Sequence, residues 1–263
     1  MTTSTLTSLR PARAMLVAVA VSAALLYSTQ SGALVRALAN ATAWPKWPYL
    51  VSGVATASDL LVMALLVMAA AGLGAREAAR LSGISASPRQ PLRWAAWVLV
   101  PALLACALLA QPSPDLGMLD FAWRAVGSPV FEELTYRGLA VGALMRICGW
   151  RLLPACLWPA VFFGVAHAWQ GADLASALGI AAITGAGGLL FGWLYVRWGF
   201  NLWPALLLHV GMNGLWEIFA FGEDAIGGWL GNGVRLAVVL AAVLLTFRFA
   251  PGRRRRGADP VDR

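Results

Sequence analysis

Eight long apolar stretches constrain the fold of this 263-residue chain more than any other feature. Because about 20 helical residues cross the hydrocarbon core of a bilayer, each stretch is long enough for one membrane span. Their approximate bounds are 14–36, 49–74, 94–110, 129–146, 152–170, 174–196, 202–220 and 229–249. Hydrophobic residues make up 60% of the chain and charged residues only 12%. The pattern predicts an all-α, polytopic transmembrane bundle of about eight helices in the cell membrane.

The positive charges predict how these spans are oriented. The net charge is +8, and most arginines fall in loops that share one side if the N-terminus is cytoplasmic. The opposite side receives most of the acids of the loops, which are Asp115, Asp120, Asp173, Glu223 and Asp224. The positive-inside rule therefore places both termini in the cytoplasm. The arginine run 253–256 suits contact with anionic lipid headgroups, and no nucleic-acid partner is expected.

The chain divides into three parts by composition. Residues 1–93 hold an N-terminal pair of spans and a cytoplasmic loop, residues 94–249 form the membrane core in which the candidate catalytic residues described below lie, and residues 250–263 form a basic cytoplasmic tail. Before the core, the one intramembrane carboxylate is Asp59, to which we assign no role. The sequence gives no oligomeric state.

One span of the core is rich in glycine at four-residue spacing. Its glycines are Gly179, Gly185, Gly187, Gly188 and Gly192. Small residues at this spacing let helix backbones approach closely, so we expect this span to pack at the centre of the bundle.

Two adjacent acids and an arginine lie in the fourth apolar stretch. Ser128 and Pro129 suit the cap and first turn of a helix that starts there. On an α-helix, Glu133 and Arg137 are four residues apart and can pair, whereas Glu132 points about 140° away from Arg137. Arg137 then neutralises Glu133, and Glu132 is left as a candidate general base. The alternative is a buried ion pair that only locks helices together, and we favour it for Glu133 and Arg137.

Both histidines of the chain lie inside apolar stretches. His167 follows Phe163 by one helical turn, and His209 precedes Asn213 by one turn, so each pair shares a helix face. Polar groups at bilayer depth are costly and usually serve chemistry or transport. Either histidine alone also fits a structural role, but together with Glu132 they form a candidate site.

These residues form three ordered patterns that resemble the motifs of the CPBP family of intramembrane proteases, which includes the type II CAAX prenyl endopeptidases. The patterns are Glu132-Glu133-x-x-x-Arg137, Phe163-x-x-x-His167 and His209-x-x-x-Asn213. The resemblance covers roughly residues 120–220, and the order of the motifs on separate helices matches as well.

The resemblance implies a peptidase in which Glu132 and His167 activate water. His209 and Asn213 would then stabilise the oxyanion of the tetrahedral intermediate. Glu132, His167 and His209 are also a familiar set of zinc ligands, and the sequence leaves this alternative open. We prefer the metal-free mechanism, because asparagine is a poor zinc ligand and no HExxH helix is present.

The expected orientation places the site in the outer half of the bilayer. Glu132 would lie about one turn below the outer face, and His167 near the outer end of its span. The expected substrate is thus a membrane-anchored protein or peptide, cut near its extracytoplasmic end as by a sorting or maturation protease. Two alternatives remain: a proton- or cation-coupled transporter, and a non-catalytic adaptor or immunity protein of the same fold.

Overall fold

The fold is a bundle of helices, seen here in a computed structural model that describes residues 11–114, 116–222 and 226–251. No strand occurs within these ranges, so the predicted all-α class is confirmed. The helices are α1 (Pro11–Ser28), α2 (Ser31–Ala41), α3 (Leu50–Ala71), α4 (Ala75–Ser82), α5 (Arg89–Leu109), α6 (Met118–Asp120), η2 (Phe121–Gly127), α7 (Ser128–Glu132), η3 (Glu133–Val141), α8 (Gly142–Arg146), α9 (Leu152–His167), η4 (Ala168–Gln170), α10 (Leu174–Arg197), α11 (Trp203–Ile218) and α12 (Trp229–Phe249).

Six of these helices are long and apolar enough to cross a membrane: α1, α3, α5, α9 with η4, α10 and α12. The chain is therefore a multi-pass membrane protein. The other two predicted spans correspond to α11 and to the helical run from α6 to α8. The total of eight spans stays a prediction.

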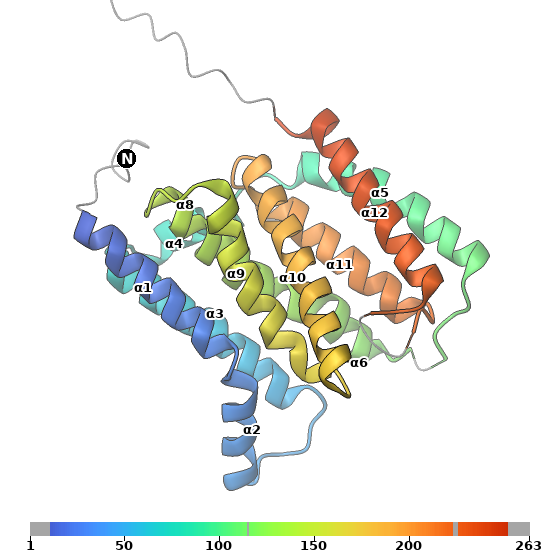
Figure 1. The fold of residues 1–263 in the computed structure, drawn as a ribbon, viewed down its shortest axis with the longest axis horizontal. Coiled ribbons are helices and arrows are strands. Elements are labelled where there is room, and N and C mark those ends of the chain that lie inside the picture. Colours follow the sequence, from blue (N-terminus) through green and yellow to red (C-terminus); the bar gives the residue numbers. More distant parts are fainter. Residues whose placement is uncertain (1–10, 115, 223–225, 252–263) are drawn as a thin grey trace, which may run out of the picture.

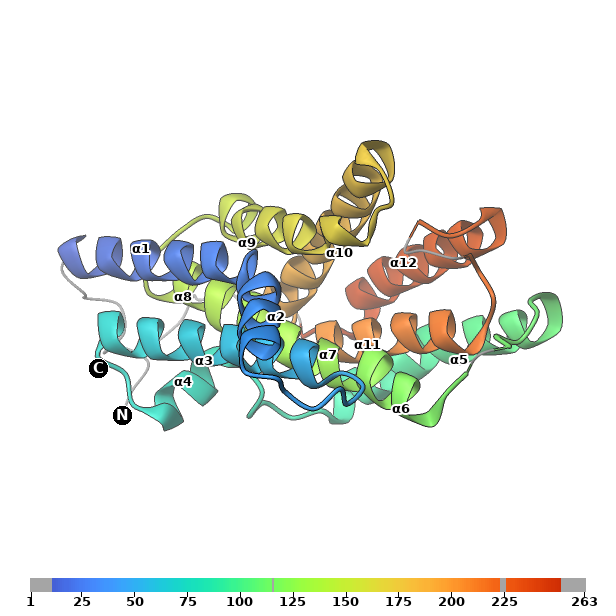
Figure 2. The same ribbon diagram turned by 90° about the horizontal axis from the view of Figure 1, so that it is seen from below.

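The first apolar stretch is not one helix, as its expected bounds 14–36 had implied. α1 ends at Ser28, and α2 leaves at a steep angle to it (Figure 1, Figure 2). The hydroxyls of Ser28 and Thr29 donate to the carbonyls of Leu25 and Leu26, three residues earlier. Such side-chain bonds compete with the helical backbone, which explains why the helix breaks at these residues. The expected loop before the core is also partly helical, since it contains α4.

The predicted helix start at Ser128 and Pro129 is wrong, because helix continues from Met118 to Arg146 through both residues. A proline inside an α-helix lacks a donor and clashes with the carbonyl four residues earlier. Here the turn before it is the π-helix η2, whose wider winding accommodates the ring. Ser128 does not cap a helix, and its hydroxyl instead donates to Glu132 Oε1 at 2.5 Å. Glu132 thus lies near the middle of a long helical run.

Contacts between loops define two ends of the bundle. At one end, which we call the arginine-rich end, arginine and glutamine side chains donate to carbonyls of neighbouring segments. The pairs are Arg146–Leu81, Gln90–Phe249 and Arg197–Pro251. At the other end, backbone bonds join Ser113 to Ile218 and Ala220 to Gln111. The helices alternate between these ends as the charge pattern requires. Which end faces the cytoplasm stays a prediction, and Asp115, Glu223, Asp224 and the arginine run 253–256 lie outside the described residues.

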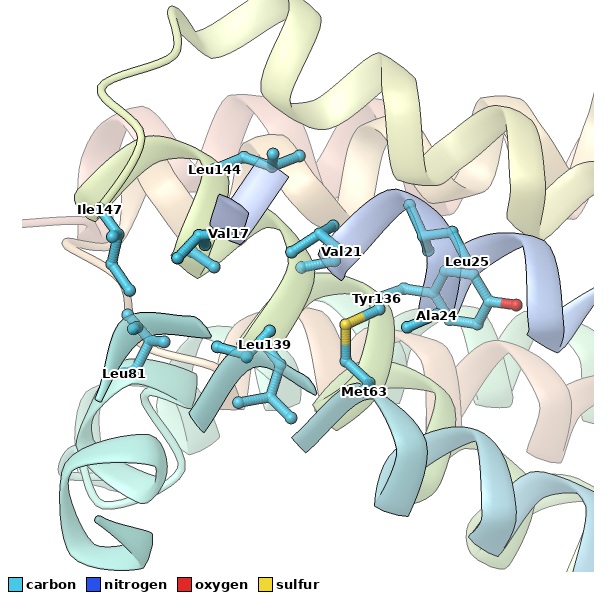
Figure 3. Close-up of a cluster of buried hydrophobic side chains, with 14 of the residues drawn as sticks. Val17, Val21, Ala24, Leu25, Met63, Leu81, Tyr136, Leu139, Leu144 and Ile147 are labelled. Carbon is cyan, nitrogen blue, oxygen red and sulfur yellow. The ribbon is translucent and has the colours of Figure 1, made fainter. Parts of the chain in front are cut away.

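The N-terminal helices are fixed to the core by a buried apolar cluster (Figure 3). Val21 and Leu25 of α1 and Met63 of α3 pack there with Leu139 of η3 and Leu144 of α8, and all five are almost completely buried. A second cluster joins α5, α10, α11 and α12. The run from α6 to α8 therefore contacts the N-terminal helices on one side and the rest of the core on the other.

Helices α9 and α10 approach closely through glycines, as predicted for the glycine-rich span. A Cβ atom on Gly192 would meet Cys156 Sγ at 3.1 Å, and one on Gly188 would meet Ala160 Cα at 3.3 Å. From the other helix, a Cβ on Gly164 would lie 2.3 Å from the carbonyl oxygen of Ala181. The two backbones are thus too close for larger residues at these positions.

Replacing Gly164 with alanine should therefore destabilise the bundle. Because the new methyl group meets backbone and not a flexible side chain, we expect a loss of about 1–3 kcal/mol and a lower midpoint of thermal unfolding in detergent. Gly32→Ala is the matched control, since nothing lies within 4 Å of a Cβ there. Equal midpoints for the two variants would contradict this account.

Candidate active site

The buried carboxylate of Glu133 contacts both Arg137 and His209 at the centre of the candidate site. Arg137 Nη1 lies 2.9 Å from Glu133 Oε1, so the predicted pairing of these residues is present. His209 Nδ1 lies 2.8 Å from the same oxygen. Glu133 is 0% exposed and Arg137 1%. Since a buried charge is costly unless paired, the two residues stabilise each other's ionised form.

Aromatic rings surround the guanidinium of Arg137. Its central carbon lies 4.4 Å from the ring centre of Phe163 and 5.2 Å from that of Phe191. A Cβ on Gly188 would lie only 3.1 Å from Arg137 Nη2, so this glycine leaves the space that the guanidinium occupies. Nη1 has its ion-pair contact with Glu133, and Nη2 is buried without a hydrogen-bond partner in the described residues. The aromatic faces thus replace the hydration that the cation loses.

His209 is held in one orientation by two contacts. Its ring stacks on Phe191, with centres 4.9 Å apart and planes at 23°. Its Nδ1 donates to Glu133, because an ionised carboxylate only accepts. The Nε2 atom is consequently turned toward Glu132, 3.8 Å from Oε2. Glu133 thus selects the nitrogen that His209 presents to the site.

Glu132 faces His209 at the centre of the candidate site. One of its oxygens accepts the Ser128 hydroxyl, and the other faces His209. It is also within electrostatic range of His167. The structure therefore places Glu132 beside His209 and within electrostatic range of His167, and the roles of these residues stay predictions.

His167 is the last residue of α9, and its Nδ1 lies 2.7 Å from the carbonyl oxygen of Phe163. A carbonyl oxygen can only accept, so Nδ1 carries the hydrogen. In the neutral ring, Nε2 then has a free lone pair. The nitrogen of His167 that is not bound to the backbone is thus a candidate proton acceptor.

Asn213 has a different environment from the one that its predicted role suggested. Its Nδ2 donates to the backbone carbonyl of Arg124 at 3.0 Å. That residue belongs to η2, so one of the two amide hydrogens of Asn213 fixes the π-helical segment. The second hydrogen is the one that remains for a substrate.

One group near the site was not predicted. Asp59 of α3 received no role from the sequence, but it is within electrostatic range of Glu132 and hydrogen-bonds Ser31. Its Oδ1 is buried without a hydrogen-bond partner in the part of the chain that is described. An acid inside an apolar stretch was the available signal, yet no spacing in the sequence connects it with Glu132.

The arrangement of donors also bears on the zinc alternative. Across residues 11–114, 116–222 and 226–251, no group of three or more His, Cys, Asp or Glu side chains is placed to hold a metal ion. Nδ1 of each histidine is bonded, to Glu133 or to a backbone carbonyl, which leaves Nε2 as the nitrogen that a metal would use. Because the described side chains form no group that could hold a metal ion in this arrangement, we derive no step through zinc.

The apolar helices and the buried carboxylate–imidazole cluster define a multi-pass membrane protein with a polar site inside its bundle. The model of a known family, described as type II CAAX prenyl endopeptidase Rce1-like, matches residues 94–215. The match confirms the resemblance seen in the three motifs and contains all of them. It supports protease activity of the CAAX intramembrane type. Searches of curated proteins and of solved structures found no match.

Removing the positive charge of Arg137 should strongly destabilise the protein. Arg137→Met leaves Glu133 buried and unpaired, which we expect to cost about 3–5 kcal/mol. Chemical unfolding in detergent would measure this loss, and Glu133→Gln in the same chain should recover part of it.

Arg124→Met is the matched control. Arg124 also pairs with a glutamate, Glu217, at 3.5 Å, but its side chain is 60% exposed. Such a pair contributes less than about 1 kcal/mol. Equal losses for the two arginines would show that burial does not decide the cost.

Proposed function

We propose that this protein is an intramembrane endopeptidase that hydrolyses a peptide bond of a membrane-associated protein or peptide. The observation that carries the proposal is the Glu132 carboxylate 3.8 Å from His209 Nε2, with His167 within electrostatic range of it. The family match over the same residues supports the reaction type. It does not favour the transporter or adaptor alternatives.

Glu132 and His167 activate the attacking water in this proposal. One oxygen of Glu132 accepts from Ser128, which leaves the other to accept a proton from water. His167, whose Nδ1 is bonded to the Phe163 carbonyl, keeps Nε2 as its proton acceptor. The water oxygen attacks the carbonyl carbon, its proton passes to this pair, and the pair returns it to the leaving nitrogen. The pair therefore acts once as base and once as acid.

His209 and Asn213 donate to the oxyanion. Because Nδ1–H of His209 is used by Glu133, the ring must also carry a hydrogen on Nε2 to donate. With this proton the buried charges of Glu132, Glu133, Arg137 and His209 sum to zero, which a site of low dielectric favours. A well-placed donor lowers the barrier by about 3–4 kcal/mol. Glu133 and Arg137 act through His209 and are positioning residues.

The substrate class follows from the bilayer location and the family. We propose a membrane-anchored protein, and the family name adds prenylated proteins as candidates. Cleavage near the extracytoplasmic end, as in sorting or maturation, is part of the proposal because His167 ends α9 away from the arginine-rich end. Glu132 itself lies deeper than expected, near the middle of its helical run. The substrate must therefore bring its peptide bond into the bundle.

Glu132→Gln should abolish cleavage while the protein stays folded. The amide keeps the shape of the side chain but cannot take the proton of water. Mass spectrometry of membrane proteins from cells with either form should find new termini only with the wild type. Their distance from the membrane anchor of the substrate tests the extracytoplasmic position.

Glu217→Gln is the control for this experiment, since Glu217 pairs with the exposed Arg124 and takes no part in the proposed chemistry. It should leave the new termini unchanged. Termini that persist in Glu132→Gln would refute the assigned base, and their absence from the wild type under good coverage would favour transport or an adaptor.

Chelation should leave the activity unchanged, because the proposed mechanism needs no metal ion. Purified protein would be treated with a zinc chelator, dialysed and assayed on a substrate found by mass spectrometry. Activity that falls and returns with one zinc per chain would overturn the metal-free mechanism and assign Glu132, His167 and His209 as ligands.

A further inference from the structure

Three arginines line a pocket between the start of α5 and the end of α12. These two helix ends lie at the same end of the bundle, the arginine-rich one (Figure 1). Its volume is about 540 Å³, and its lining residues are Arg89, Gln90, Arg93, Arg248 and Phe249. We refer to it as the arginine pocket. Within the described residues, no carboxylate lies at ion-pair distance from any of the three arginines. Like charges held together without a counterion repel, so an anion would stabilise this part of the fold.

The walls of the arginine pocket are fixed before any ligand binds. The Gln90 side chain donates to the carbonyl of Phe249, which joins the two helices at their ends. One turn deeper, the buried Trp94 packs against Trp198, whose Nε1 donates to Thr246 of α12. The arginines therefore project from two helices that are fixed to each other.

We propose that the arginine pocket binds the phosphate headgroup of an anionic phospholipid. Guanidinium groups form paired, charge-assisted hydrogen bonds with phosphate oxygens, and three arginines line this pocket. The volume also lies in the usual range for small-molecule sites. The proposal does not depend on the proteolytic function.

Apolar side chains beside the pocket distinguish a lipid from a free phosphate ion. Trp97 lies one helical turn below Arg93 on the same face of α5 and is 65% exposed. Leu244 lies one turn below Arg248 on α12 and is 67% exposed. Both would contact the acyl chains of a lipid whose phosphate occupies the pocket. Basic pockets between membrane helices on the cytoplasmic side are typical sites for such headgroups.

The test is lipid binding to the full chain in detergent, measured by native mass spectrometry. Phosphatidylglycerol should bind at least tenfold more tightly than phosphatidylcholine. Neutralising the pocket with Arg89→Gln, Arg93→Gln and Arg248→Gln together should remove at least tenfold of that affinity. The matched control is Arg76→Gln, Arg80→Gln and Arg151→Gln, which removes the same charge from exposed arginines outside the pocket and should leave the affinity unchanged.

A second pair of variants keeps all three arginines. It therefore tests the proposal even if the triple arginine variant fails to fold. Trp97→Ala should weaken phosphatidylglycerol binding several-fold, whereas Trp229→Ala, at an exposed position at the other end of α12, should not. Equal loss in the control arginine variant, equal binding of phosphatidylcholine, or no effect of Trp97→Ala would overturn the proposal. Displacement of the lipid by millimolar inorganic phosphate would do so as well, since it would define a free-anion site.

Discussion

One oxygen of Glu133 receives both Arg137 and His209, and the inner half of the bundle is organised around this shared contact. The rings of Phe163 and Phe191 pack against the guanidinium of Arg137. Gly188 has no side chain and so leaves room for this group. These residues come from η3, α9 and α10, and His209 adds α11. An ion pair buried in this way costs much to desolvate, so all four helices must be in place before it is favourable. The result is a fixed imidazole facing Glu132.

The π-helical turns of the long run affect the site directly. The segment η2 allows Pro129 to lie inside a helix and exposes the carbonyl of Arg124 to Asn213. The segment η3 begins immediately after Glu132, so the two acids lie where the winding of the helix changes. Wide turns of this kind are frequent at functional sites, where they redirect side chains that a regular helix would present elsewhere.

The sequence predicted local relations well and distant ones poorly. Apolar length identified the helices, and four-residue spacing identified the Glu133–Arg137 pair, because both depend on neighbours along one helix. The predicted helix start at Pro129 was wrong. A proline is tolerated in the first turn of a helix, but here it follows a π-helical turn inside a continuous helical run. The break after Ser28, the bond from His209 to Glu133 and the approach of Asp59 to Glu132 all arise from packing between helices. Spacing within one helix carries no information about them.

Tyr136 extends the influence of the N-terminal helices into the catalytic region. It lies about one helical turn after Glu132 and Glu133. Its hydroxyl donates to the hydroxyl of Ser28 at the end of α1. Neither α1 nor α3 lies within the segment that matches the family. The run that holds the carboxylates thus packs against helices outside the matched segment. A chimera that combined residues 94–249 with a foreign pair of helices would keep every motif. It would lose the packing and the Tyr136–Ser28 hydrogen bond that position the helix carrying Glu132 and Glu133.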